Sequence, residues 1–189
     1  MADKLNVLAI CGSLRKASFN RMLMNASIGL APEGMTITEA PSFASIPIYN
    51  FDDQQATGFP ASVNAWADAI RAADGVLFVS PEYNWTIPGG LKNAIDWISR
   101  MKEVPIKDKP VAVQSAAGGL LGGARAQLAL RQSLVSLDVL WFGRPEVIVS
   151  FAAQKFDEKE GKLKDETAIN MVKAQMAAFE KFIRQVSGK

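Results

Sequence analysis

Apolar runs alternate with amphipathic segments along this chain, and the two patterns predict different elements. Short runs rich in Val, Leu and Ile predict buried strands, whereas apolar residues that recur every three or four positions predict helices. We expect strands at residues 5–11, 35–39, 76–80 and 111–115, with a broken fifth strand at 139–141 and 147–149. We expect helices at residues 18–31, 60–73, 88–100, 123–137 and 166–187. The mixed-charge run 155–166, before the last helix, predicts a solvated loop or a small hairpin.

This alternation of strands and helices predicts an α/β fold with a parallel sheet covered on both faces. The runs 5–11, 76–80 and 111–115 are almost wholly apolar, as central strands are, whereas 35–39 alternates like an edge strand. That ordering suits the flavodoxin-like three-layer sandwich, whose five-stranded sheet has the order 2-1-3-4-5 and whose ligand crevice lies at the carboxyl ends of its strands. The sequence shows no internal repeat and no second domain, so residues 1–189 are expected to form one domain.

The composition limits which kinds of partner the protein is expected to bind. The 189 residues are 49% hydrophobic and 21% charged, as in an ordinary globular protein, with a net charge of +2. Lysine and arginine are scattered and form no basic stripe, so we expect no nucleic acid partner. The longest stretch without charge, residues 110–124, is too short and too rich in glycine to span a bilayer, so no membrane insertion is expected.

The absence of histidine and the single cysteine limit the catalytic and metal-binding chemistry that the chain can perform. The chain has no histidine, which excludes Ser-His-Asp, Cys-His and histidine–metal sites, and we predict no metal centre. Its single cysteine, Cys11, cannot form an intrachain disulfide and ends an apolar strand, so a buried side chain is favoured over a reactive thiol. Residues 1–4 lack the basic region of a signal peptide, and together these features predict a cytoplasmic protein.

The segment after the first strand has the layout of a phosphate cradle. Glycine, hydroxyls, an arginine and an amide precede or open a helix, and a helix N-terminus offers unpaired N–H groups and a partial positive charge. Ser13, Ser18 and Asn20 can add side-chain donors, and Arg15 can add a forked cationic one. We therefore expect a phosphorylated cofactor here.

Two further loops follow the third and fourth strands and should reach the same crevice. Residues 80–90 are rich in prolines and aromatics; Pro81 and Tyr83 can pack against a flat ring while Asn84 reaches its polar edge, although the aromatics can instead fill the core. Residues 115–123 hold four glycines, whose backbone can approach a heterocycle or can form a turn without contact. Neither GxGxxG nor GxxxxGK[ST] occurs in the chain.

A phosphate site, a flat aromatic wall and an amide-rich edge together describe FMN. Two stretches of the chain, taken together, resemble the NAD(P)H-dependent FMN reductase family and within it most closely the bacterial chromate and quinone reductases. These stretches are Gly12-Ser13-Leu14-Arg15-Lys16-x-Ser18-x-Asn20, and Pro81-Glu82-Tyr83-Asn84 followed by Pro88-Gly89-Gly90-Leu91-Lys92-Asn93-Ala94-Ile95-Asp96-Trp97.

The resemblance assigns residues to the site. It implies that the phosphate is held by the first loop, the isoalloxazine is bordered by the second, and the far edge of the ring meets the third. The implied cofactor-binding residues are Ser13, Arg15, Ser18, Phe19, Asn20, Pro81, Glu82, Tyr83, Asn84, Ser115 and Gly118. Trp85 stands where the family often has tyrosine and is expected to shape the nicotinamide or acceptor pocket. Arg100, Lys102 and Arg125 are candidate cations for an anionic acceptor, with ordinary solvated charges as the alternative.

The resemblance also implies an activity. Such an enzyme passes two electrons from NADPH or NADH through FMN to quinones and chromate-type acceptors by ping-pong kinetics, without a protein nucleophile. Family members form homodimers, often paired into tetramers. The alternative is a flavodoxin-type electron carrier, although such carriers are usually acidic and lack the arginine of the first loop. A fold that has lost its cofactor and serves as an interaction protein is a third reading.

Overall fold

A computed structural model describes residues 3–188, so Met1, Ala2 and Lys189 lie outside the described residues. The described strands are β1 (Leu5–Cys11), β2 (Met35–Glu39), β3 (Gly75–Val79), β4 (Pro110–Ala116), β5 (Leu140–Trp141), β6 (Val147–Val149), β7 (Phe156–Asp157) and β8 (Lys162–Leu163). The described α-helices are α1 (Phe19–Gly29), α2 (Phe51–Thr57), α3 (Ala61–Ala72), α4 (Gly89–Ile98), α5 (Ala124–Leu134), α6 (Ala152–Lys155) and α7 (Glu166–Ser187). A short 3-10 turn, Val135–Leu137, extends α5.

The main sheet has the strand order β2-β1-β3-β4-β5, and its pairs are parallel. Strand β4 is longer than β5: Val111 pairs with Trp141, and further along Ser115 pairs with Ile148 of β6. The predicted order and the predicted break in the fifth strand are both confirmed. The small hairpin expected within residues 155–166 is also present, as the antiparallel pair β7–β8.

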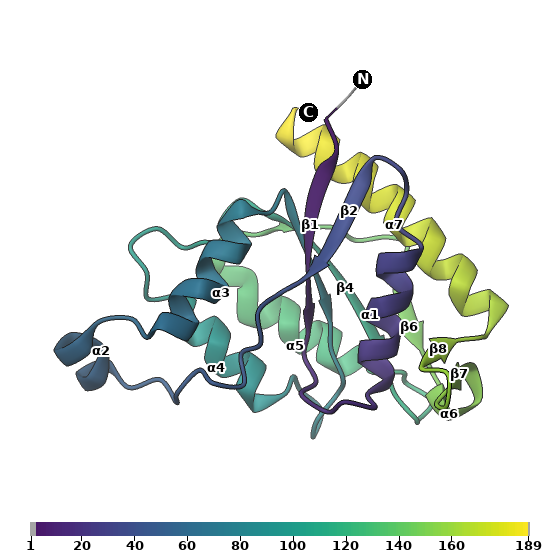
Figure 1. Ribbon diagram of the computed structural model, residues 1–189, viewed down its shortest axis with the longest axis horizontal. Coiled ribbons are helices and arrows are strands. Elements are labelled where there is room, and N and C mark those ends of the chain that lie inside the picture. Colours follow the sequence, from purple (N-terminus) through teal and green to yellow (C-terminus); the bar gives the residue numbers. More distant parts are fainter. Residues whose placement is uncertain (1–2, 189) are drawn as a thin grey trace.

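Helices cover both faces of this sheet. Helices α1 and α7 pack on one face, and α3, α4 and α5 pack on the other (Figure 1). Successive side chains of a strand point to opposite faces, so in β1 Val7 and Ala9 join the first layer while Leu8 and Ile10 join the second. Strands β1, β3 and β4 are buried on both faces, which is why their sequences are continuous apolar runs.

Helix α2 was not predicted. None of its seven residues is buried, so it lacks the apolar stripe that reveals a helix in a sequence. It begins where the Asn50 side chain accepts a hydrogen bond from the backbone N–H of Asp52 at 3.0 Å. It projects from the molecule on the long connection between β2 and α3 (Figure 1). The ends of the predicted helices lie within three residues of the observed ends, and both ends of the last helix are as predicted.

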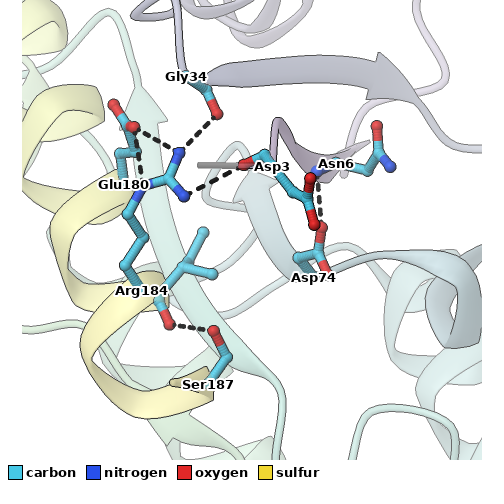
Figure 2. A network of polar contacts seen from close by, with 8 residues as sticks. Asp3, Asn6, Gly34, Asp74, Glu180, Arg184 and Ser187 are labelled. Atoms are coloured by element: carbon cyan, nitrogen blue, oxygen red, sulfur yellow. Dashed lines mark hydrogen bonds and ion pairs between the residues drawn. The ribbon is translucent and has the colours of Figure 1, made fainter. Parts of the chain in front are cut away.

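The start of β1 and the end of α7 lie together, at the end of the sheet where the strands begin (Figure 1). There, the Arg184 side chain of α7 donates to Glu180 Oε1 at 2.9 and 3.1 Å and to the backbone carbonyls of Asp3 and Gly34, both at 3.1 Å. Figure 2 shows this arrangement, in which one guanidinium joins α7 to the segments that precede β1 and β2. We call Asp3, Gly34, Glu180 and Arg184 the Arg184 cluster.

The loops that follow the strands gather at the opposite end of the sheet.

Within residues 3–188, no helix combines the length and the apolarity that a membrane crossing needs. The same residues include no group of three or more acidic, cysteine or histidine side chains placed to hold a metal ion.

Candidate cofactor site

The three loops predicted to converge do so, around a cavity of about 290 Å³ at the carboxyl ends of β1, β3 and β4. The cavity is lined by Ser13, Arg15, Ser18, Phe19, Asn20, Pro81, Glu82, Tyr83, Ala116, Ala117 and Gly118. Of the predicted cofactor-binding residues, only Asn84 and Ser115 are missing from this lining. Ala116 and Ala117 were not predicted, although they stand between two residues that were.

The first loop places two buried hydroxyls in the cavity wall. Ser18 caps α1 by accepting a hydrogen bond from the backbone N–H of Asn20 at 3.2 Å, and Ser13 Oγ accepts from the N–H of Arg15 at 3.3 Å. In both bonds the hydroxyl is the acceptor, so its hydrogen can be donated to a ligand. Helix α1 begins at this wall and adds the N–H groups of its first turn.

Gly12 allows the first loop to approach β3. A Cβ at Gly12 would lie 2.5 Å from Ser80 Oγ and 2.9 Å from Ser80 Cβ, closer than packed atoms can come. The backbone N–H of Gly12 also donates to the carbonyl of Val79 at 2.9 Å. A side chain here would push the first two loops apart, so this glycine is needed to form the cavity.

Asn20 holds two walls of the cavity together. Its Nδ2 donates to the carbonyl of Ala116 at 2.8 Å, and its Oδ1 accepts from the N–H of Ala116 at 2.9 Å. The sequence suggested a phosphate donor, but the structure uses both ends of this buried amide to join α1 to the end of β4. One Nδ2 hydrogen remains for a ligand.

Arg15 is the single cation in the cavity lining. Its side chain is exposed and folds back so that Nη2 donates to the carbonyl of Ala17 at 2.6 Å. This contact keeps the guanidinium beside the two serine hydroxyls and the start of α1. Cation, hydroxyls and helix N-terminus together make this side of the cavity suited to a phosphate.

The second loop forms a tight hairpin. Tyr83 and Thr86 exchange backbone hydrogen bonds of 2.9 and 3.1 Å, and the two residues between them are left-handed, with φ of 48° for Asn84 and 70° for Trp85. This turn leaves Pro81 and Tyr83 in the cavity lining and carries Asn84 to the tip of the hairpin, outside it. A left-handed conformation is uncommon for a tryptophan and costs about 1 kcal/mol or more.

An ion pair links the second loop to α5. Arg125 Nε donates to Glu82 Oε1 at 2.6 Å, and Nη2 contacts the same oxygen. The other carboxylate oxygen, Glu82 Oε2, is buried and has no hydrogen-bond partner. On its other side the guanidinium stacks on Trp85, with its central carbon 4.1 Å from the ring centroid. We call Glu82, Trp85 and Arg125 the Arg125 cluster.

The other predicted cations lie elsewhere. Arg100 lies over the ring of Tyr49 at 5.6 Å, and neither it nor Lys102 lines the cavity. Arg125 is close to the cavity through Glu82, as predicted for a residue near the mouth, but it is paired. Sequence reasoning missed this pairing.

The third loop presents backbone to the cavity. Ala116, Ala117 and Gly118 line it, whereas Ser115 is fully buried behind them and accepts a hydrogen bond from Gln127 Nε2 at 2.9 Å. Gly123 permits this close packing: it has a φ of 93°, and a Cβ there would lie 2.7 Å from Ser115 Cβ. The place in the cavity wall that was predicted for Ser115 is therefore taken by the next three residues.

Cys11 takes no part in the cavity lining. It is 7% exposed, as expected for a buried residue, and its thiol donates weakly to the carbonyl of Ser13 at 3.5 Å. Burial raises the pKa of the Cys11 thiol above its ordinary value of 9.0. The side chain is therefore a neutral thiol at physiological pH and a poor nucleophile.

The residues present fit FMN. Anion-binding groups lie on the α1 side, Pro81 and Tyr83 offer apolar contact, and backbone groups of residues 116–118 can meet a polar ring edge. The volume of about 290 Å³ is just below the usual range for ligand pockets, roughly 300–1,000 Å³.

The chain was compared with known proteins. Residues 5–154 match the family model described as NADPH-dependent FMN reductase. A quinone reductase of Escherichia coli K12 is 46% identical over 186 residues, covering 98% of this chain and 99% of the reductase. An NAD(P)H-dependent FMN reductase of Pseudomonas aeruginosa is 45% identical over 188 residues, covering 100% of both chains.

A solved structure shares the fold. FerB, a flavoenzyme described as an NAD(P)H:(acceptor) oxidoreductase from Paracoccus denitrificans, matches with a TM-score of 0.85 and 32% identity. The match covers 96% of this chain and 98% of FerB. The predicted family and the predicted flavodoxin-like fold are both confirmed: this chain belongs to the NADPH-dependent FMN reductase family.

Proposed function

We propose that this protein is an FMN-dependent NAD(P)H oxidoreductase that reduces quinones. One observation carries the proposal: three loops far apart in the sequence form a single cavity with a phosphate-type wall, an apolar wall and a backbone wall. Two relatives that match over nearly their whole length are named as a quinone reductase and an FMN reductase, which supports the same activity.

Each wall has its own task in this proposal. Ser13, Arg15, Ser18 and the first turn of α1 bind the phosphate of FMN; Pro81 and Tyr83 contact the ring; and residues 116–118 orient its polar edge. When bound, FMN accepts a hydride from the nicotinamide and passes the electrons to the acceptor. The protein therefore needs to position both molecules but needs no nucleophile, in keeping with a chain that has no histidine.

Several finer points belong to the same proposal. NAD(P)H and the acceptor use the same open face in turn, which gives ping-pong kinetics, and chromate-type oxyanions are further acceptors. The protein works as one domain, in a homodimer or a dimer-of-dimers tetramer, in the cytoplasm. The single domain, the oligomeric state and the cytoplasmic location rest on the family resemblance and on the composition.

The phosphate wall provides the test. In Arg15→Ala the cavity loses its cation, and a charge-assisted hydrogen bond of about 1.5–3 kcal/mol corresponds to roughly 10- to 100-fold weaker FMN binding. Lys16→Ala is the matched control, because Lys16 is an exposed neighbour outside the lining. FMN affinity is measured by fluorescence titration of the apoprotein, alongside NADPH and NADH oxidation with a quinone.

Three results would contradict the proposal. A wild-type protein that takes up no FMN would remove the cofactor assignment. Equal FMN affinity in the Arg15 and Lys16 variants would remove the phosphate assignment. A protein that binds FMN tightly but oxidises neither nicotinamide would be an electron carrier of the flavodoxin type.

A further inference from the structure

We infer that Glu82 sets the charge preference for electron acceptors: it cancels the charge of Arg125 at the edge of the site and so favours neutral quinones over multivalent anions. The inference rests on the proposed function and deepens it, because it concerns which acceptors the same site accepts. It assigns Glu82 a specificity role, separate from any contact of the second loop with the flavin.

The geometry places one charge of the pair inside the site and the other at its edge. Glu82 lines the cavity, and its side chain is 9% exposed, whereas Arg125 is 34% exposed and lies outside the lining. Both guanidinium contacts go to Oε1, which leaves Oε2 buried without a partner. A buried carboxylate is costly without a counter-charge, so Arg125 is the group that offsets the cost of burying Glu82 in this position.

Trp85 holds the other side of Arg125. The guanidinium stacks on the indole at 4.1 Å, and Trp85 as a whole is 72% exposed. Trp85 occupies this place in a left-handed conformation, with a φ of 70°, which a structure keeps only where other interactions offset the strain. The arginine is thus fixed between the second loop and the indole, and its charge cannot move freely toward a ligand.

This arrangement decides the electrostatic field that an acceptor meets. The ion pair carries no net charge, so an incoming anion feels only a weak dipole from it. Without the negative charge of Glu82, one unit of positive charge remains at the edge of the site. For a trivalent anion about 8 Å away, that charge is worth about a three- to tenfold gain in encounter at low ionic strength, and salt removes most of it.

The experiment is a double-mutant cycle with Glu82→Gln and Arg125→Gln, each close in shape to the residue it replaces. For every FMN-loaded protein, kcat/KM is measured per bound flavin at saturating NADPH, with ferricyanide and with the neutral 1,4-naphthoquinone. The readout is the ferricyanide ratio, which is kcat/KM with ferricyanide divided by kcat/KM with 1,4-naphthoquinone, expressed relative to wild type. The sulfonate of the same quinone is a matched acceptor that changes charge but keeps the ring.

The inference predicts an order of ratios. Glu82→Gln raises the ferricyanide ratio about three- to tenfold at low salt, and Arg125→Gln lowers it, because an unpaired carboxylate then faces the anion. The double variant returns near the wild-type ratio. The sulfonated quinone shows the same order with changes of about twofold, and the differences shrink in about 0.5 M salt.

Other outcomes overturn it. A ratio that is unchanged in both single variants, or a rise in Glu82→Gln that persists in the double variant, shows that charge cancellation does not set the preference. If Glu82→Gln fails to bind FMN, the lower ferricyanide ratio predicted for Arg125→Gln still tests the inference. Failure of the proposed function is separate, since it appears as a wild-type protein without quinone reduction.

Discussion

Two arginines of this protein pair with glutamates at opposite ends of the sheet, and their surroundings differ. In the Arg184 cluster, the guanidinium also binds two backbone carbonyls, from segments about 150 and 181 residues away in sequence. In the Arg125 cluster, both contacts go to one oxygen of Glu82, the other oxygen has no partner, and a strained tryptophan covers the guanidinium.

The difference separates structural from functional ion pairs. At the amino end, the bonds of Arg184 to Asp3 and Gly34 tie α7 to two other parts of the fold, as expected of a group that contributes to stability. At the carboxyl end, an unpaired buried oxygen and a left-handed tryptophan are local costs that bring no evident stability. Such departures from local rules are expected where a site has to meet a ligand.

The largest predicted effect comes from Asn20, which lies at the carboxyl end of the sheet but, like Arg184 at the amino end, joins two parts of the fold. Asn20 is buried and bonds both the carbonyl and the N–H of Ala116, so Asn20→Ala leaves two backbone groups without partners. We expect the free energy of unfolding of the apoprotein to fall by about 2–4 kcal/mol, together with loss of FMN. Urea unfolding without cofactor measures the first effect.

The control is Asn25→Ala, an exposed position on the same helix. It should change the free energy of unfolding by less than about 0.5 kcal/mol. If Asn20→Ala were as stable as this control, the bridge from α1 to β4 would have no structural importance. The carboxyl end would then depend on the ligand alone.

The next prediction sharpens the comparison directly. Arg184→Met removes the bonds to Asp3, Gly34 and Glu180 but keeps much of the apolar stem, and we expect a loss of about 1–2 kcal/mol with unchanged FMN affinity. Arg125→Met leaves the buried Glu82 carboxylate without its counter-charge and so also lowers stability, but unlike Arg184→Met it should alter acceptor preference. Unfolding curves measure the stability of both variants and acceptor assays compare their preferences, and a changed acceptor preference in Arg184→Met would contradict the contrast.

Burial explains how much of this architecture the sequence could predict. Strands β1, β3 and β4 are covered on both faces, so their apolar runs are visible in the sequence, and their loops must then meet at one end. Helix α2 has no buried face and left only its Asn50 cap and the acidic first turn as signals. Its absence from the prediction follows from its exposure.

The pairing of side chains inside the site was beyond the sequence. Asn20 and Ala116 are 96 residues apart, and Glu82 and Arg125 are 43 apart, so each contact depends on how two loops bend. The bends are set by φ values, at Gly123 in the third loop and at Trp85 in the second, that residue patterns do not reveal. Nine of the eleven predicted cofactor-binding residues line the cavity, but several of their partners could not be foreseen.

A smaller effect tests the strain in the Arg125 cluster. Trp85→Gly and Trp85→Ala both remove the stack on Arg125, but only glycine adopts a φ of 70° without penalty. We expect the glycine variant to be more stable than the alanine variant by about 1 kcal/mol in urea unfolding of the apoprotein. Alanine as the more stable of the two would show that the hairpin is not strained at this position.

The smallest predicted effect on stability concerns Cys11, whose thiol is buried in the core at the carboxyl end of β1. Because burial raises its pKa above 9.0, the thiol ionises in the unfolded chain before it does so in the folded protein. Stability from this group is therefore complete well below pH 9 and declines as the pH rises through and above that value. Lysines and tyrosines titrate in the same range, so the informative quantity is the difference in slope between wild type and Cys11→Ala. A steeper decline in wild type places Cys11 with the stabilising groups, whereas equal slopes would mean that the folded protein exposes this thiol and that the carboxyl end is more open than its packing indicates.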